Sequence, residues 1–361
     1  MAANPFATGW MRAFIQMRRP TNFLQSLFTM RPDNAYNGEK IEVDIQRFDE
    51  NVAVAIKAGT ESNLNDMSLV TGKEFTPPAY GEAIPCNVND LLQRSVGIDP
   101  YTDAGISYAS KLIRQLTRAY EVIVAMITRG VEIQASQILQ TGKLVLTGYG
   151  SDVRYELDFK PKASHFPTVT TSWSAAGATP LQDLQALIDV IRTDGKVSAN
   201  QAIFGATALR NFLQNDEVKA QLDNRRINIG EVRPRLDSKG ATFYGYVWIG
   251  AYMVEMWTYP EEYTDPSTGL PVKYVEDDKV ILLSDQTRLD FTTARVPLPL
   301  GPDPRVANIM PGRLLDAGNN MDMTPNLYCT PNGKQIMAEV ESRPLLIPTQ
   351  IDGFGCLDTE I

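Results

Sequence analysis

Residues 103–142 indicate the fold most directly, and they read DAGISYASKLIRQLTRAYEVIVAMITRGVEIQASQILQTG. Apolar residues recur every seven positions in two seams, namely Ile106, Ile113, Tyr120 and Ile127 in one, and Ala109, Leu116 and Ile123 in the other. Asp103 stands where an N-cap is expected, and Gly142 stands where a helix commonly ends. The pattern therefore predicts a single helix over residues 103–141, roughly 55–60 Å long at 1.5 Å per residue.

The apolar stripe of this predicted helix is narrow for its length. A stripe of that kind indicates a helical spine along which other elements pack. Gly130 lies inside the stretch, where a glycine costs about 1 kcal/mol relative to alanine. We expect it to mark a bend in the helix.

A different period precedes the helix. Ile41, Val43 and Ile45 alternate with polar residues, which predicts a half-buried strand. The alternation continues over residues 52–56, and residues 59–81 are then rich in glycine, asparagine and proline. Long loops of this kind usually carry a function. We expect a long two-stranded excursion with a mobile tip.

The N-terminal segment, residues 1–38, carries short apolar faces at helical spacing: Trp10, Phe14 and Met17, and then Phe23, Leu24, Leu27 and Phe28. Such short pieces are not stable alone in water and need a surface to lie on. We therefore interpret this segment as an arm.

The pattern after the helix alternates between strands and helices. Strands are expected at 144–147, 154–159, 203–204, 246–249, 253–257, 280–283, 335–340 and 345–347, with helices at 184–191 and 206–222. Residues 161–180 read as a connector, and residues 265–269 read as a surface turn. The fold class expected is α+β, with the second α/β module starting near residue 176.

Composition limits the classes of function. The chain has 361 residues, of which 43% are hydrophobic and 21% are charged, which is enough for two or three modules with a sizeable core. Its net charge of −9 argues against a protein that grips nucleic acid by counterion release. No apolar run approaches the ~20 residues that span a bilayer, so no membrane is expected. Cys86, Cys329 and Cys356 lack CxxC spacing, which favours a reducing cytoplasm.

The sequence offers little for catalysis. His165 is the single histidine, and there is no GxSxG nucleophile motif. Paired acids such as Asp277-Asp278 point to opposite faces of a strand and do not converge. We predict no catalytic residue, no cofactor site and no metal site, and hence no enzyme. Arg12, Arg18 and Arg19 form a basic cluster, and we favour an acidic surface of a neighbouring subunit over nucleic acid as its partner.

Several short segments resemble the lambda-type coat proteins of tailed phages in order and spacing. They are residues 23–28 (FLQSLF) with 39–41 (EKI), 74–77 (EFTP), 142–143 (GK), 147–148 (TG), 223–226 (DNRR), 244–245 (YG), the strand at 280–283 and 342–345 (SRPL). The likeness runs over nearly the whole chain, and the fold that it implies is the Hong Kong 97 capsid fold.

This resemblance implies a domain order. It is an N-terminal arm at 1–38, an extended loop (E-loop) with flanking strands at 39–100, the spine helix and first part of a peripheral domain at 101–175, an axial domain at 176–330, and returning strands of the peripheral domain at 331–361. The candidate contacts between subunits are Trp10, Arg12, Phe14, Arg18, Arg19, Phe23, Phe28, Phe75, Pro77 and Tyr80.

The resemblance also implies a function. The chain is expected to be a major capsid protein that assembles into hexamers and pentamers around double-stranded phage DNA, in the host cytoplasm and then in the virion. The expected partners are the portal, a separate scaffold protein and a decoration protein at threefold positions. An encapsulin-like shell is the alternative, which a neighbouring cargo gene would favour. A soluble enzyme or carbohydrate-binding protein would instead behave as a monomer or dimer.

Overall fold

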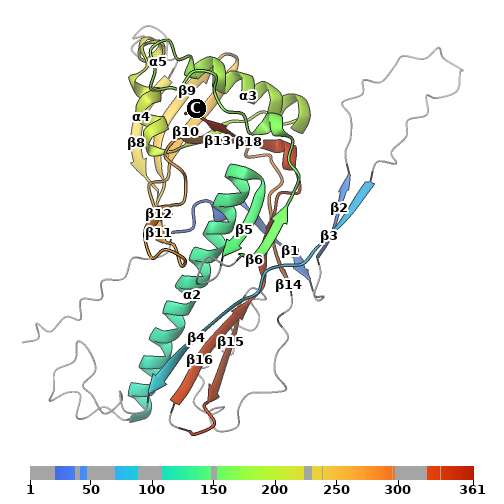
Figure 1. Cartoon of the computed structure of the whole chain (residues 1–361), viewed down its shortest axis with the longest axis vertical. Helices are drawn as coiled ribbons and strands as arrows, with labels where there is room; N and C mark the ends of the chain where they lie inside the picture. The colour runs from blue at the N-terminus through green and yellow to red at the C-terminus, as the bar shows by residue number, and fades with distance from the viewer. Residues whose placement is uncertain are drawn as a thin grey trace, which may run out of the picture.

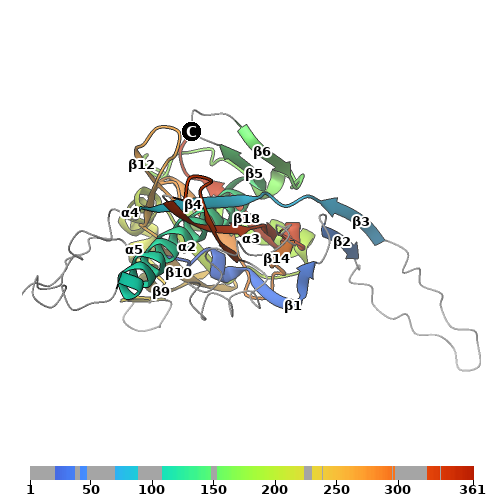
Figure 2. The ribbon, with the colours of Figure 1, turned by 90° about the horizontal axis from the view of Figure 1, so that it is seen from below.

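The computed structural model of the chain describes residues 21–36, 41–46, 70–87, 108–147, 153–222, 230–237, 239–294, 296, 323–333 and 335–361. Figure 1 shows an elongated molecule in which one long helix, α2, runs from the lower end into the body below a second, wider module. The hairpin of β2 (Ile41–Gln46) and β3 (Val70–Phe75) projects from the side of the body (Figures 1 and 2).

Helix α2 spans Tyr108–Thr141. Its end at Gly142 is confirmed: this residue has φ +65°, and Pro161 lies where a Cβ would be. Both seams are buried where the structure describes them, except that Ile113 is 41% exposed, so its assignment to the buried stripe is wrong. By length and composition alone the segment 111–141 could cross a membrane, a test that buried core helices also pass, and 56% of its apolar 18-residue window is buried here.

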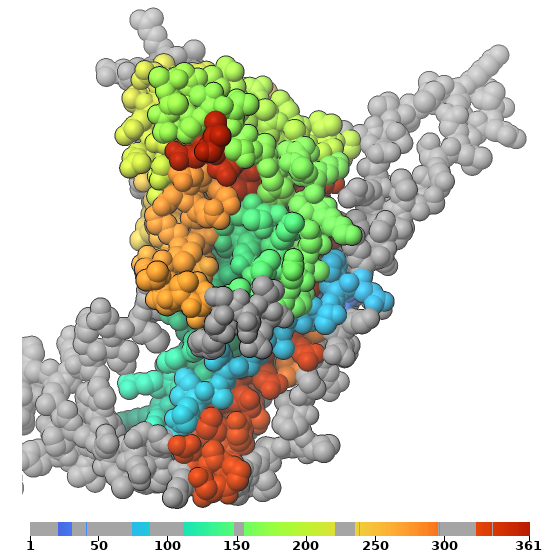
Figure 3. Space-filling model, in the orientation of Figure 1, coloured from blue at the N-terminus to red at the C-terminus, as the bar shows by residue number. Residues whose placement is uncertain are grey.

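The first half of α2 packs on a three-stranded antiparallel sheet. The sheet has the order β15 (Thr324–Cys329), β16 (Gln335–Ser342) and β4 (Tyr80–Asn87). Leu116, Ile123 and Ile127 of the helix face Ala338 and Val340 of β16 in one apolar cluster. Helix and strands lie side by side at the lower end of the molecule in Figure 3.

The upper module contains a six-stranded sheet. Its order is β18 (Phe354–Asp358), β13 (Lys279–Leu283), β7 (Gln201–Phe204), β10 (Tyr252–Thr258), β9 (Thr242–Ile249) and β8 (Gly230–Leu236). Only the pair β7–β10 is parallel among these described strands. Helices α3 (Pro180–Gly195), α4 (Ala206–Gln214) and α5 (Asp216–Leu222) cover one face (Figure 1).

A central core joins the two parts. The second half of α2 enters it with Val131, Ala135, Ile138 and Leu139. Around these residues lie a second three-stranded sheet and two hairpins: β1 (Thr29–Tyr36), β14 (Asp290–Ala294) and β17 (Pro344–Ile347); β5 (Lys143–Thr147) and β6 (Val153–Asp158); and β11 (Glu262–Thr264) and β12 (Pro271–Lys273). Short 3-10 turns occur at Gln25–Leu27 (η1), Ala163–His165 (η3) and Ile351–Gly353 (η5).

Most expected elements are confirmed, but one expected helix is broken, and strands β1, β8, β15 and β18 were not expected. The helix expected over 206–222 breaks at Asn215, whose extended backbone ends α4 and whose side-chain oxygen accepts the N–H of Glu217. Strand β18 was not expected, because its small and polar residues obscure a buried run. It pairs with β13, so the last strand of the segment 331–361 lies in the upper module and not with the returning strands of the lower one.

Candidate assembly surfaces

The root of the N-terminal arm is part of the chain's own core. Leu24 is fully buried, and Phe23 and Phe28 are 6% and 5% exposed. The ring of Phe23 lies 5.5 Å from that of Trp257 and 5.5 Å from that of Tyr259. Folding of one chain already removes these side chains from water, so Phe23 and Phe28 have almost no surface to offer a neighbouring subunit. Contact with a neighbour through them stays a prediction.

A buried carboxylate holds this root on the spine helix. Glu132 of α2 is fully buried, and its two oxygens accept the backbone N–H groups of Leu24 (2.8 Å) and Gln25 (2.9 Å) at the start of η1. Burial raises the pKa of Glu132 to about 7, although both backbone N–H groups favour the ionised form. The contact therefore joins the arm to the helix through a group that titrates near neutrality.

The root of the excursion is equally well packed. Ile41 of β2 is fully buried. Phe75 at the end of β3 is buried against Phe159, with 5.6 Å between ring centroids. Pro77 is also buried, and the Tyr155 hydroxyl donates to the carbonyl of Thr76. Phe75 and Pro77 were expected to contact another subunit, but this chain already covers them.

Tyr80 lies between the excursion and the spine. Its hydroxyl accepts a hydrogen bond from Gln134 Nε2 (2.8 Å), and burial raises the pKa of Tyr80 to about 12. A Cβ added at Gly130 would lie 2.9 Å from Tyr80 Cε1. Helix α2 is continuous through Gly130, so the glycine admits the tyrosine ring, and no helix break marks the position where we expected a bend. Tyr80 is half-buried and mainly an internal contact.

The remaining arm candidates, Trp10, Arg12, Phe14, Arg18 and Arg19, lie outside the described residues. As contacts between subunits they stay predictions.

Two apolar faces remain open on the described part of the chain. One is the outward stripe of α2, formed by Ile113 and Val124, whose neighbours Thr117 and Thr128 donate their hydroxyls to the carbonyls of those same two residues. The helix itself satisfies these hydroxyls, so the two threonines need no hydrogen-bond partner from another chain.

The second open face lies on β9 and β10. Trp248 and Met253 are register partners on these strands and are 40% and 49% exposed. Exposed aromatic and methionine side chains that adjoin one another are typical of protein contact surfaces.

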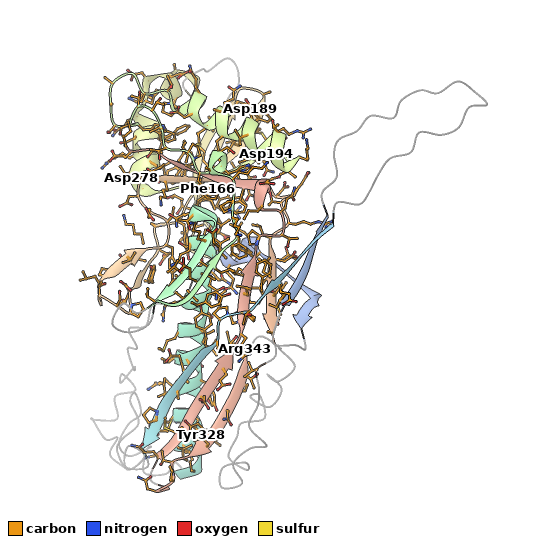
Figure 4. All side chains as sticks on the ribbon, turned by 45° about the vertical axis from the view of Figure 1, so that its right-hand side comes forward. Phe166, Asp189, Asp194, Asp278, Tyr328 and Arg343 are labelled. Atoms are coloured by element: carbon orange, nitrogen blue, oxygen red, sulfur yellow. The ribbon has the colours of Figure 1, made fainter. Side chains whose placement is uncertain are left out.

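The residues considered for catalysis have structural roles. His165 is fully buried: Nδ1 lies 3.0 Å from the carbonyl oxygen of Phe354, and Nε2 lies 3.2 Å from Asp194 Oδ2. Asp194 also pairs with Lys162 at 2.8 Å, which lowers the pKa of the aspartate. Together these contacts tie η3 to α3 and β18. Asp278 lies on a different part of the upper module from Asp194 (Figure 4), so these acids do not converge.

The described residues contain no group of three histidine, cysteine or acidic side chains that could hold a metal ion. Cys86 and Cys356 are buried, and burial raises the pKa of the Cys356 thiol to about 12. A thiol with so high a pKa is a poor nucleophile. The described arrangement supports packing and assembly and offers no constellation for catalysis.

Comparison with known proteins decides the family. A family model described as phage major capsid protein E matches residues 10–354. The chain belongs to the phage major capsid protein E family. The resemblance to lambda-type coat proteins is thereby confirmed, and with it the capsid-forming function and a place in the virion. Proteins of this family are structural components of the head that associate with copies of themselves.

One solved structure with a TM-score above 0.5 agrees with the fold expected for a phage major capsid protein. The chain is similar to a protein assigned as the capsid protein of a prophage in Escherichia coli CFT073, with 16% identity over 94% of this chain and 93% of the other, and a TM-score of 0.61. It is also similar to the SrpI encapsulin of Synechococcus elongatus PCC 7942, with 12% identity over 94% of this chain and 87% of the other, and a TM-score of 0.46. No curated protein sequence matches the chain.

Sequence reasoning missed Glu132 as the residue that holds the arm of this capsid protein. The sequence does carry a signal, because Glu132 is an acid between two apolar residues, Val131 and Ile133, of the predicted helix. A carboxylate at such a position must find buried partners, but the sequence does not show that they are backbone N–H groups more than a hundred residues away.

Proposed function

We propose that this capsid protein assembles as hexamers and pentamers, with the lower sheet and spine helix as a peripheral domain and the six-stranded sheet as an axial domain. The observation that supports this most strongly is the family match over residues 10–354. The two described modules meet at one shared core, so a subunit with two ends can contact different neighbours at each.

The two extensions would supply the long-range contacts. Residues 39–100 would reach over an adjacent subunit, and the arm before residue 21 would lie along another. Support comes from their roots, since Phe75 and Leu24 are fixed in the subunit's own core and give each extension a defined starting point. We also propose that the outward stripe of α2, Ile113 to Val124, is covered by a second copy.

The finer partners are the portal, a separate scaffold protein, a decoration protein at threefold positions and packaged double-stranded DNA, with assembly in the host cytoplasm. The net charge of −9 supports a shell wall to which DNA does not adhere. An encapsulin-like shell remains the second candidate, and the phage family match favours the capsid.

Negative-stain electron microscopy tests the proposal. We would image the purified protein alone and after co-expression with its genomic neighbours. Closed, uniform shells or discrete pentamers and hexamers support it, and nucleic acid or cargo enzyme inside separates capsid from encapsulin. Small compact particles under all of these conditions, at high concentration, would contradict it.

A further inference from the structure

The upper module has an open cleft on its surface. It lies on the face of the six-stranded sheet opposite α3 and α4, and six residues of β8 to β10 and the β8–β9 turn line it: Arg235, Asp237, Phe243, Tyr246, Glu255 and Trp257. The three aromatic rings form a continuous row, with Phe243 5.1 Å from Tyr246 and 5.0 Å from Trp257.

The chemistry of the cleft suits a cationic side chain. The Trp257 indole donates to Glu255 Oε2 at 3.0 Å, which holds this carboxylate beside the ring and leaves its other oxygen available. Asp237 supplies a second carboxylate, against the single guanidinium of Arg235. Carboxylates next to an aromatic row bind a guanidinium well, because it can pair with the acid and stack on a ring.

The start of the described chain lies at the rim of this cleft. Phe23 packs on Trp257, 5.5 Å between ring centroids. Thr21 lies against the β8–β9 turn that carries Asp237: a Cβ added at Gly240 would be 2.6 Å from Thr21 Cγ2, and Gly240 N–H donates to the Asp237 carbonyl. The residues directly before Thr21 include Arg18 and Arg19. The Cα of Arg19 can lie no more than about 7 Å from that of Thr21.

We propose that this cleft binds Arg18 and Arg19 of the same chain, with Glu255 and Asp237 as their partners. The occupant is the chain's own arm, since connectivity brings these two arginines to the rim before any neighbour is present. This differs from our expectation that both contact another subunit, which remains the proposal for Trp10, Arg12 and Phe14. The cleft would act as a second anchor for the arm, next to Glu132, and would set the direction in which the arm leaves the subunit.

Zero-length crosslinking tests the contact directly. In an Arg18→Lys, Arg19→Lys variant of the full chain, a carbodiimide would join either lysine amine to Glu255 or Asp237 if they form an ion pair. Mass spectrometry of the digested protein then identifies the linked peptides. We expect links to Glu255 or Asp237 and none to Asp216 or Glu217 of α5, which serve as exposed control carboxylates.

Isotope mixing identifies the chain that supplies the arm. Labelled and unlabelled variants would be combined and co-assembled before crosslinking, and the expected linked peptides carry one isotope only. Mixed-isotope peptides would mean that a neighbour's arm occupies the cleft, and the absence of any link to Glu255 or Asp237 would mean that the arm does not. Either result overturns the proposal.

Proteolysis of the natural arm provides a second measurement. Trypsin cuts after Arg18 only when the arm leaves the cleft, so the cutting rate follows the open population. In the variant Glu255→Gln, Asp237→Asn, two partly exposed pairs are lost, and the rate should rise about fivefold. The matched variant Asp216→Asn, Glu217→Gln should cut at the natural rate. Equal rates for both variants would overturn the proposal, and they would leave the capsid function untouched, because shell formation is assayed separately.

Discussion

Replacing Glu132 by glutamine should change how the stability of the arm depends on pH. Glu132 is fully buried and accepts the N–H groups of Leu24 and Gln25. Its pKa is raised from 4.5 to about 7, mainly by burial. A raised folded-state pKa means that the stabilising contribution is fully present below pH 4.5 and is lost as pH rises through 7. The docked arm is therefore more stable in mild acid than in mild base.

The size of the effect follows from the shift. At 1.36 kcal/mol per unit, moving the pKa from 4.5, its value in water, to about 7 corresponds to at most about 3 kcal/mol of docking free energy between acid and base, the value reached when release of the arm exposes Glu132 to water. Glu132→Gln removes this dependence, because the amide does not titrate. Above pH 7 the amide offers one oxygen where the carboxylate offers two, so one buried N–H loses its acceptor, at about 1–3 kcal/mol. Below pH 7 the natural side chain is a neutral acid with one carbonyl oxygen, as in the amide.

Hydrogen exchange of the peptide that spans residues 21–28 measures the docking free energy, after correction for the intrinsic pH dependence of exchange. In the natural protein we expect protection to fall by about two orders of magnitude between pH 5 and pH 8, which corresponds to about 3 kcal/mol. In the Glu132→Gln variant protection should be nearly constant with pH. Parallel pH profiles for the two proteins would refute the reasoning, because they would show that Glu132 does not titrate with the arm docked.

Three further changes test the packing and the open surface of the subunit. Gly130→Ala should destabilise the chain by about 1–2 kcal/mol in thermal unfolding, because the clash with Tyr80 at 2.9 Å outweighs the gain in helix propensity; an unchanged or higher Tm would contradict this. Phe23→Ala should cost about 3–5 kcal/mol in urea unfolding of the isolated subunit, and a loss below 1 kcal/mol would mean that the arm root is not part of the core. Ile113→Glu should leave subunit stability within about 0.5 kcal/mol but prevent shell formation seen by electron microscopy, and normal shells would exclude the α2 stripe as a contact.

The parts of the fold that could be predicted are those with strong local periodicity. Helix α2 was predicted to its last residue, because the seven-residue repeat and Gly142 are both local signals. Strand β2 and the turn at Asp265 were also predicted from local sequence signals. Strand β18 was not, because FGCLD has neither alternation nor length, and its burial depends on pairing with β13.

The candidate contact residues show a different limit. Phe23, Phe28 and Phe75 are apolar residues in segments that look unable to fold alone, and the sequence cannot show whether such residues are covered by the same chain or by another. The structure covers them within the subunit. Only tertiary contacts distinguish these two cases, and here the deciding contact is Glu132 to the backbone of Leu24 and Gln25, across a separation of more than a hundred residues.

Fixing the roots of both extensions inside the subunit has a consequence for assembly. If the directions of the arm and the excursion are set before subunits meet, less conformational entropy is lost when they bind. Each contact between subunits can then be weak, because many such contacts act together with high effective concentration in a closed shell. Substitutions at the roots of the extensions and substitutions farther out should therefore affect different properties. Changes at Leu24 or Phe75 should destabilise the isolated subunit, whereas changes at Trp10 or Phe14 should leave the subunit folded and act only on assembly.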